Sequence, residues 1–269
     1  MAMRLIDSGC RVYLPSIDHG KKASEILVAS GAEWFSKADV DIYCFCLPKT
    51  DHVVKCIERF PPSRAVEMFD FSTGDPHKAG DLVAMASDSG SLYLDCPVSG
   101  SAAQAVSGNL TMWIGSTEDD ATPLCCEIVQ KLTAKCFWMG RYGAGFSAKL
   151  VNQVIHILNV AAIGEGLKLA EAQGLRREHV VESLMSASAA SAMLDRFGSA
   201  IAMKDHSAQF RLELAAKDIE YAMGAVSSEV RREMPYLEAL KRDLDRAIAR
   251  GFQDKNFTCF IDTEEETVD

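Results

Sequence analysis

Residues 143–174 read GAGFSAKLVNQVIHILNVAAIGEGLKLAEAQG and form the longest apolar segment of the chain. Their apolar residues recur with the period of an α-helix, which predicts one long helix over residues 145–173. A polar stripe follows the same helix at positions i, i+3, i+4 and i+7, and it consists of Lys149, Asn152, Gln153 and His156. One helical face therefore carries an ammonium group, two amides and an imidazole.

This polar face has two interpretations. A solvated face usually carries Glu, Lys and Arg in i, i+4 pairs, whereas this one has a single charge followed by amides. We expect the face to be buried or to line a cleft, where Lys149 needs compensation by an anionic substrate group or a proton-transfer role. The other interpretation is an amphipathic helix with a weakly polar outer side.

The composition limits the classes of partner. The chain has 269 residues, of which 48% are hydrophobic, and this is enough for a sizeable core in two domains. A formal net charge of -10 argues against nucleic acid or an anionic membrane as a partner. No uninterrupted apolar run reaches the roughly 18 residues of a membrane span. The nine cysteines contain no CxxC pair, so we interpret them as reduced thiols and expect no metal site.

The two halves of the chain differ in pattern. The first half alternates short apolar runs with helical stretches, which predicts a mostly parallel α/β sheet. Its strand candidates are residues 11–14, 41–47, 65–71, 91–95, 110–114 and 135–139, with a helix over 77–87. After Gly143 the periodicity is helical, and helices are predicted over residues 145–173, 177–186, 212–230 and 235–250. We predict an α/β domain over residues 1–141, an all-α domain over 142–269, and an acidic end, 260–269, that frays.

Two long motifs identify a family. Residues 95–115 read DCPVSGSAAQAVSGNLTMWIG, and residues 143–153 read GAGFSAKLVNQ. They resemble the β-hydroxyacid dehydrogenase family, with its patterns DAPVSGG-x-x-GA-x-x-G-x-L and G-x-G-x-x-x-K-x-x-NN. That family includes 3-hydroxyisobutyrate dehydrogenase and the tartronate and succinic semialdehyde reductases. The related 6-phosphogluconate dehydrogenases would have a His in place of Asn152 and a longer helical domain, so that branch is disfavoured.

The resemblance implies a Rossmann-like NAD(P)-binding domain and a helical dehydrogenase domain. It implies an oxidoreductase that interconverts a small 3-hydroxy acid and its semialdehyde with NAD or NADP. In this family Lys149 would be the catalytic acid/base. Ser99 and Gly100 would present a hydroxyl and a backbone N–H to the substrate carboxylate, and Asn152 would orient the substrate. The residues expected at the cofactor are Leu47, Pro48, Ser72, Thr73 and Lys217.

The resemblance also bears on assembly and location. As in the family, the helical domain is expected to form a homo-oligomer, because the long helix is too apolar for a monomer surface. The cytoplasm is the default location, and a mitochondrial one follows if the true N-terminus lies upstream.

Several positions depart from the family pattern. The opening MAMRLIDSGCRVYL matches the helix and strand that follow the family's first strand and G-x-G-x-x-G turn. In the strand order 3-2-1-4-5-6 the absent strand is the middle one, so two strands should lack their shared neighbour. Ser101 and Gln104 replace glycines of the substrate loop, and Gln153 replaces an Asn. The segment 15–18 replaces the acid that would bind the adenosine ribose, so NAD and NADP both stay open.

Three hypotheses follow from these departures. The first is an enzyme of this family whose sequence here is an incomplete start or a shortened isoform. The second is a non-catalytic binding or assembly protein that kept the helical domain. The third is a degenerate product that folds poorly. Because the pyrophosphate turn is absent, we expect this chain to bind a dinucleotide weakly.

Overall fold

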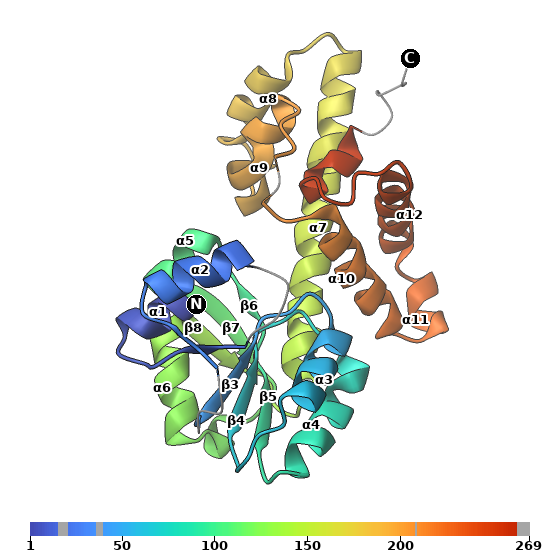
Figure 1. Ribbon diagram of the computed structural model, residues 1–269. Coiled ribbons are helices and arrows are strands. Elements are labelled where there is room, and N and C mark those ends of the chain that lie inside the picture. The colour runs from blue at the N-terminus through green and yellow to red at the C-terminus, as the bar shows by residue number, and fades with distance from the viewer. Residues whose placement is uncertain (16–20, 36–39, 208, 263–269) are drawn as a thin grey trace. The chain divides into compact units, whose positions relative to one another are not determined.

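The computed structural model describes residues 1–15, 21–35, 40–207 and 209–262 (Figure 1). The chain divides into two compact units, Met1–Lys149 and Leu150–Asp269. The first unit is mixed α/β and the described part of the second is helical, which confirms the predicted fold class. The replaced ribose-binding segment at 16–18 and residues 263–269 of the acidic end lie outside the described residues. The predicted fraying of 260–269 is wrong for Phe260 and Ile261, because both side chains are buried in the helical core.

Short sheets form the framework of the first unit. In one sheet β1 (Tyr13–Leu14) pairs in parallel with β2 (Glu33–Trp34). A second sheet has the parallel order β3 (Ile42–Phe45), β4 (Glu67–Asp70) and β5 (Leu92–Asp95). In the third, β7 (Leu110–Ile114) lies between β6 (Val98–Ser99), which is antiparallel to it, and β8 (Thr133–Trp138), which is parallel.

As expected, β1 and β2 form a sheet separate from that of β3, β4 and β5. Within the described residues, β1 and β3 are edge strands of two separate sheets and are not hydrogen-bonded to each other. Strands β2 and β6 lie outside the predicted candidates, because neither lies in an apolar run long enough to show a strand pattern. The other strands fall at the predicted places, and β7 has the predicted bounds.

Alternating side chains on β4 and β5 place helices on both faces of their sheet (Figure 1). Met68 and Tyr93 belong to one core with α3 (Thr50–Arg59) and α4 (Ala79–Ser87). Phe69 and Leu94, one residue further on, belong to the opposite core with α1 (Ala2–Asp7) and α6 (Pro123–Leu132). This is the period of two that a sheet covered on both faces requires. The remaining helices of this unit are α2 (Lys21–Ala29), α5 (Ala102–Ser107), and the 3₁₀ turns Pro76–Lys78 and Glu118–Asp120.

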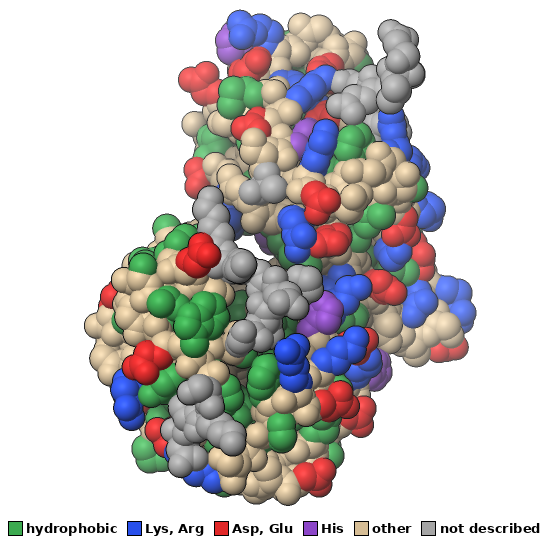
Figure 2. All heavy atoms as spheres, in the orientation of Figure 1, with side chains coloured by type: hydrophobic (Ala, Val, Ile, Leu, Met, Phe, Trp, Pro, Cys, Tyr) green, Lys and Arg blue, Asp and Glu red, His purple; other side chains and the backbone are tan. Residues whose placement is uncertain are grey.

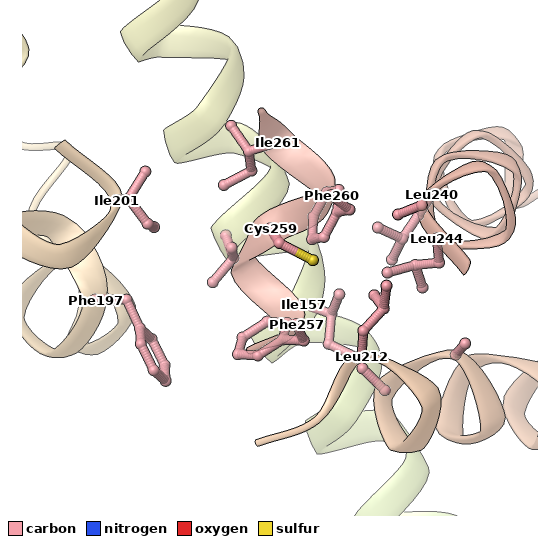
Figure 3. Close-up of a cluster of buried hydrophobic side chains, with 14 of the residues drawn as sticks. Ile157, Phe197, Ile201, Leu212, Leu240, Leu244, Phe257, Cys259, Phe260 and Ile261 are labelled. Atoms are coloured by element: carbon pink, nitrogen blue, oxygen red, sulfur yellow. The ribbon is translucent and has the colours of Figure 1, made fainter. Parts of the chain in front are cut away.

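The second unit packs its helices around the short 3₁₀ helix η3 (Phe257–Ile261). Figure 3 shows Phe257, Phe260 and Ile261 of this turn in the middle of the core, with side chains of the surrounding helices directed toward them. These helices are α7 (Ala144–Ala172), α8 (Arg177–Leu184), α9 (Ala192–Ala202), α10 (Leu212–Gly224) and α12 (Pro235–Ala249). The short helix α11 (Ser228–Arg232) has no buried residue and adds no side chain to this core. The predicted helix over 212–230 is wrong beyond Gly224, because Ser227 caps a new helix there.

Helix α7 runs from the first unit into the second. Its side chains Val151, Ile155 and Leu169 are exposed by 56–64%, so the helix is apolar outside as well as inside. By length and mean hydropathy it could cross a membrane, although a third of its most apolar stretch is buried in the protein and core helices pass the same test. The sequence prediction that no span exists rested on uninterrupted runs, which Lys149 and the amides break. The mean hydropathy of the helix stays high in spite of these polar residues.

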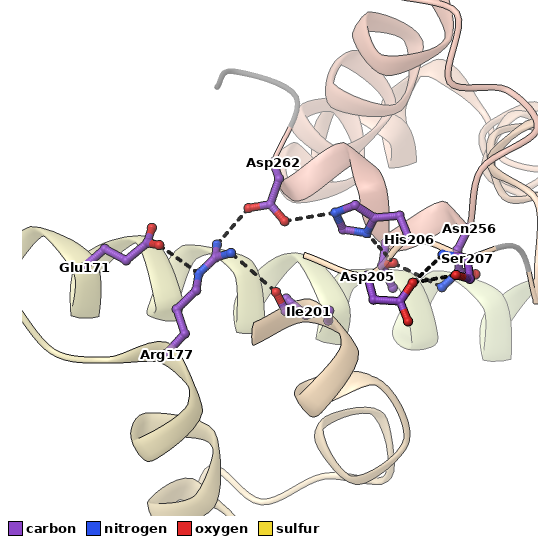
Figure 4. Close-up of polar contacts among 9 residues, drawn as sticks. Glu171, Arg177, Ile201, Asp205, His206, Ser207, Asn256 and Asp262 are labelled. Carbon is purple, nitrogen blue, oxygen red and sulfur yellow. Dashed lines mark hydrogen bonds and ion pairs between the residues drawn. The ribbon is translucent and has the colours of Figure 1, made fainter. Parts of the chain in front are cut away.

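A buried polar network ties three segments of the helical unit together (Figure 4). Arg177 at the start of α8 donates from Nη2 to Asp262 Oδ1 over 2.8 Å and from Nη1 to the Ile201 carbonyl over 3.3 Å. The other oxygen of Asp262 lies 3.1 Å from His206 Nε2. The side chain of Arg177 is only 4% exposed, so its charge depends on these partners.

Candidate active site

The two loops expected to hold the cofactor are bonded to each other. The backbone N–H of Leu47, after β3, donates to Ser72 Oγ, after β4, over 2.9 Å. Ser72 is buried, and its own N–H donates to Asp70 Oδ1 over 2.9 Å. Pro48 is exposed and Thr73 half-buried in the same loops. Leu47 and Ser72 thus meet at the carboxyl edge of a parallel sheet, where such sheets bind their ligands.

The start of α7, the helix that carries Lys149, is hydrogen-bonded to the end of the neighbouring strand β5. Asp95 ends β5, and its carboxylate accepts hydrogen bonds from the backbone N–H groups of Gly143 and Phe146 over 2.9 and 3.0 Å. Gly143 directly precedes α7 and Phe146 lies in its first turn, where N–H groups have no partner within the helix. Lys149 follows one turn later and is buried, with 8% exposure. The polar face is therefore buried at Lys149, as predicted.

The expected substrate turn is a tight connection between β6 and α5. Ser99 pairs with Thr111 of β7, and Gly100 has φ +150° with Leu110 and Gln104 packed where a Cβ would stand. Ser101 Oγ accepts from the N–H of Gln104, and the Ser101 N–H donates to Gln104 Oε1 over 2.8 Å. The two residues that depart from the family glycines thus form a capping box, which fixes the path of this loop.

The remaining candidates lie in the second unit on a chain of hydrogen bonds. Asn152 Nδ2 donates to Gln153 Oε1 over 3.0 Å, and Gln153 Nε2 donates to Asp218 Oδ2 over 2.6 Å. Asp218 Oδ1 lies 2.8 Å from Lys217 Nζ, and this ammonium stands 5.0 Å from the ring centre of Tyr221. Gln153, Lys217 and Asp218 are all buried. Lys217 is therefore a buried, paired lysine and not a surface side chain.

The candidates fall into two sets, one on each unit. Leu47, Pro48, Ser72, Thr73, Ser99, Gly100 and Lys149 belong to the first unit, and Asn152 and Lys217 belong to the second. Asp70 and Asp95, which hold the loops and the helix start of the first set, had no role in the sequence analysis. A signal was present, because strands β4 and β5 read EMFD and LYLD, and an acid that closes a buried apolar run needs a partner.

Burial dominates the electrostatics of this edge. It raises the pKa of Asp95 to about 6, while hydrogen bonds from Gly143 and Phe146 lower it and the charge of Asp70 raises it further. Burial, with the charge and hydrogen bond of Asp70, holds the pKa of Tyr93 well above its ordinary value. In the described residues no group of three or more His, Cys, Asp or Glu side chains could hold a metal ion. All nine cysteines lie in the described part and are free.

Two family models together match almost the whole chain. The model of the NAD binding domain of 6-phosphogluconate dehydrogenase matches residues 1–140. The model described as NAD-binding of NADP-dependent 3-hydroxyisobutyrate dehydrogenase matches residues 143–263. The chain belongs to the β-hydroxyacid dehydrogenase family. It is thus an NAD(P)-dependent oxidoreductase by family, with NAD or NADP as its cofactor.

Individual relatives extend this result. Mitochondrial 3-hydroxyisobutyrate dehydrogenase of Drosophila melanogaster is 25% identical over 279 residues, which cover 97% of this chain and 84% of the relative. The 2-hydroxy-3-oxopropionate reductase of Escherichia coli is 26% identical over 237 residues, covering 83% and 78%. A 3-hydroxyisobutyrate dehydrogenase structure from Mycobacterium tuberculosis, solved with L-serine, has a TM-score of 0.80 at 23% identity, covering 98% and 94%. These likenesses place the fold among such dehydrogenases.

Loops at the carboxyl edge of a parallel sheet are the usual place for a dinucleotide. The loops after β3 and β4 are fixed by the Leu47–Ser72 hydrogen bond, and Gly74 keeps the second loop free of a side chain, because a Cβ there would meet the ring of Phe146. For the pyrophosphate, the 269 residues contain no G-x-G-x-x-G sequence. The donors that usually hold that group are therefore not among them.

Proposed function

We propose that this protein interconverts a small 3-hydroxy acid and its semialdehyde, with Lys149 as the acid/base. The observation that supports this most is the placement of Lys149. It is a buried lysine one turn beyond a helix start that is bonded to Asp95, and Asp95 opens the segment that leads to Ser99 and Gly100. A buried ammonium at the carboxyl edge of a parallel sheet suits both an anionic substrate and proton transfer.

The proposed step has a simple proton balance. When bound, NAD(P) supplies the hydride for reduction of the aldehyde carbon and accepts it in the reverse direction. In reduction, the Lys149 ammonium donates a hydrogen bond to the aldehyde oxygen and gives it a proton as the C–H bond forms. In oxidation, the neutral amine takes the hydroxyl proton. Lys149 thus changes protonation state once in each turnover and is restored by solvent.

The other candidates have binding roles in this proposal. Ser99 donates its hydroxyl, and Gly100 its backbone N–H, to the substrate carboxylate. Asn152 orients the substrate, supported by its hydrogen bond to Gln153. Leu47, Pro48, Ser72, Thr73 and Lys217 contact the cofactor. In this proposal residues 1–141 form the cofactor domain and residues 142–269 the helical domain.

Steady-state kinetics of Lys149→Ala test the chemical role. The assay follows NADH or NADPH oxidation by a series of three- and four-carbon semialdehydes, with cofactor in excess. We expect Lys149→Ala to lower kcat by about a hundredfold to ten-thousandfold. Lys168→Ala, which removes another partly buried lysine of α7, is the matched control and should keep its rate. Near-normal turnover by Lys149→Ala, or no turnover by the parent chain, contradicts the proposal.

A second candidate is a non-catalytic binding protein of this family. It is favoured by the absence of a G-x-G-x-x-G sequence from the 269 residues. Isothermal titration with NADH and NADPH separates the two, because loss of several charge-assisted hydrogen bonds at about 1.5–3 kcal/mol each weakens binding by orders of magnitude. A dissociation constant in the low micromolar range would favour the enzyme.

We also propose a homo-oligomer formed through the exposed apolar side of α7. Val151 and Ile155 stand one turn apart on that side, and Leu169 lies further along. Light scattering should give a mass well above the 29.3 kDa of one chain, and Ile155→Glu should reduce it, because a charge in an apolar interface lacks a partner. A single-chain mass for the parent protein would contradict this assembly.

A further inference from the structure

Two aspartates lie side by side at the carboxyl edge of the central sheet. Asp70 ends β4 and Asp95 ends β5, and the two are direct register partners in the parallel ladder. Both are fully buried, with 0% exposure. Like charges at adjacent positions of a buried edge destabilise each other. Neither carboxylate has a part in the proposed proton transfer, so their presence needs another explanation.

Each aspartate holds a different part of the candidate site. Asp70 accepts hydrogen bonds from Tyr93 Oη over 2.6 Å and from the Ser72 N–H over 2.9 Å. Ser72 in turn accepts from the Leu47 N–H, so Asp70 also helps to hold the loop after β3. Asp95 accepts from Gly143 and Phe146 at the first turn of α7. The paired strand ends thus join the cofactor-side loops to the helix that carries Lys149.

The packing around Asp95 leaves the first turn of α7 little freedom. A Cβ at Gly145 would stand 2.5 Å from the Asp95 carbonyl oxygen and 2.8 Å from that of Trp113 in β7. A Cβ at Gly115 would collide with the Asp95 carboxylate. On the other side, the ring of Phe146 fills the space beside Gly74, two residues after Ser72. The first turn of α7 therefore packs directly against the main chain of β5 and β7 and of the loop after β4.

We infer that Asp95 is a positioning residue for Lys149: by binding the first turn of α7 it sets where the ammonium stands relative to the substrate turn. This rests on the proposed role of Lys149. Lys149 follows Phe146 by three residues, which is about 4.5 Å along a helix axis. A shift of the turn therefore moves the lysine with it. Misplacement of a reacting group by about 1 Å can reduce the rate a hundredfold.

If Asp95 positions Lys149, the rate of reduction should depend on the protonation of Asp95. Among the described residues, the titratable groups that face Asp95 are Asp70 on β4 and Tyr93 and Cys96 on β5 and its end. The first turn of α7 and the end of β7 present main chain. A protonated Asp95 carries a hydroxyl in place of one acceptor oxygen, so one of its two amide bonds weakens. Reduction should therefore slow as the pH falls below about 6, the pKa of Asp95.

Asp95→Asn tests the inference by kinetics. The variant presents an NH₂ group to one of the two amides and does not titrate. We expect kcat for reduction to fall about tenfold to a hundredfold, with the substrate KM changed less than about threefold, and the acid limb near pH 6 to disappear. Asp88→Asn, an exposed site at the end of α4, is the control. Normal kcat with the acid limb retained in Asp95→Asn, while Lys149→Ala is inactive, overturns the inference alone.

Amide hydrogen exchange provides a readout that does not need turnover. In Asp95→Asn, the amides of residues 143–147 should exchange about tenfold to a hundredfold faster than in the parent chain. Residues 157–170 of the same helix should be unchanged. If Asp95→Asn does not fold, the parent chain measured at pH 5 and pH 7.5 gives the same comparison after correction for intrinsic rates. Unchanged protection of residues 143–147 overturns the inference, whatever the activity.

Discussion

Asp95 in the α/β unit and Asp262 in the helical unit each bind the start of a helix, but through different kinds of hydrogen-bond donor. Asp95 binds the start of α7 through two backbone N–H groups and has another acid, Asp70, beside it. Asp262 binds Arg177 at the start of α8 and His206 in a loop, through hydrogen bonds of 2.8 and 3.1 Å. The donors to the Asp95 carboxylate are main-chain amides, whereas Asp262 faces the guanidinium of Arg177.

The pKa values of the two carboxyls differ in direction for this reason. Burial raises the pKa of Asp95 to about 6, because two amide hydrogen bonds offset only part of the desolvation. Burial also acts on Asp262, but hydrogen bonds from His206 and Arg177, and their charges, outweigh it and lower its pKa. A carboxyl whose pKa is lowered by cations favours the folded state when it is ionised, whereas one whose pKa is raised by burial near another acid disfavours the folded state when it is ionised.

Removal of the cation from the helical network should have the largest effect. Arg177→Met leaves Asp262 and Glu171 without their guanidinium partner, and breaking a buried ion pair costs about 3–5 kcal/mol of unfolding free energy. Urea denaturation measures this. Arg176→Ala, whose side chain is 69% exposed in its pair with Glu178, is the control and should change little. A loss below about 1 kcal/mol for Arg177→Met would mean that solvent screens the network.

The pH dependence of stability should have opposite signs at the two carboxyls. The folded pKa of Asp95 lies above its unfolded value of 3.8, so the folded state binds the proton more tightly and stability falls as the pH rises from about 4 to about 6. The stability difference between the parent chain and Asp95→Asn should fall in that window, by an order of 2–3 kcal/mol at roughly 1.4 kcal/mol per pKa unit.

At Asp262 the sign reverses. The folded pKa lies below the unfolded 3.8, so its contribution is complete above about pH 4 and is lost as the pH falls through the folded pKa. Denaturation curves of the parent chain and Asp262→Asn should therefore converge only in acid. Parallel pH profiles for Asp95→Asn and Asp262→Asn would contradict the contrast between amide and cationic partners.

A steric change at the start of α7 should have an intermediate effect. In Gly145→Ala the new methyl group meets two carbonyl oxygens of the sheet, and forcing it in costs about 1–3 kcal/mol. Gly166→Ala in the same helix has nothing within 4 Å of its Cβ, so it should stabilise the protein by about 0.5–1 kcal/mol. Thermal unfolding of both variants measures the difference. Equal shifts would show that the first turn is not seated as described.

The smallest effect is expected at the substrate turn. Ser101→Ala removes the cap of α5 and one half of the capping box with Gln104. This should cost about 1 kcal/mol of stability and raise the substrate KM more than it lowers kcat, because the loop that carries Ser99 and Gly100 becomes looser. An unchanged KM would separate the capping box from substrate binding.

Local patterns carry much of the fold. The long helix of residues 145–173 was predictable because its apolar period continues for about eight turns. Five of the six strand candidates are strands of four to six residues, which is long enough to show a strand pattern. Helix α9 was missed although Ser191 caps it, since small residues around it weaken the periodic signal. Apart from Lys149, the candidate site residues of the first unit come from the family motifs alone, because a serine or a leucine at a strand end has no chemical signature of its own.

Residue order alone was enough to predict the two kinds of unit, the lysine near the start of α7 and the family, because these depend on periodicity and motifs. Three pairings became visible in the folded chain: Asp70 beside Asp95, Ser101 with Gln104 at one helix start, and Asp218 with Lys217 and Gln153. These pairings depend on register and burial, and burial reverses the sign of a carboxyl's pKa shift according to its partners. Gln153 and Asp218 are 65 positions apart in the chain, and no local sequence pattern predicts a pairing over that separation.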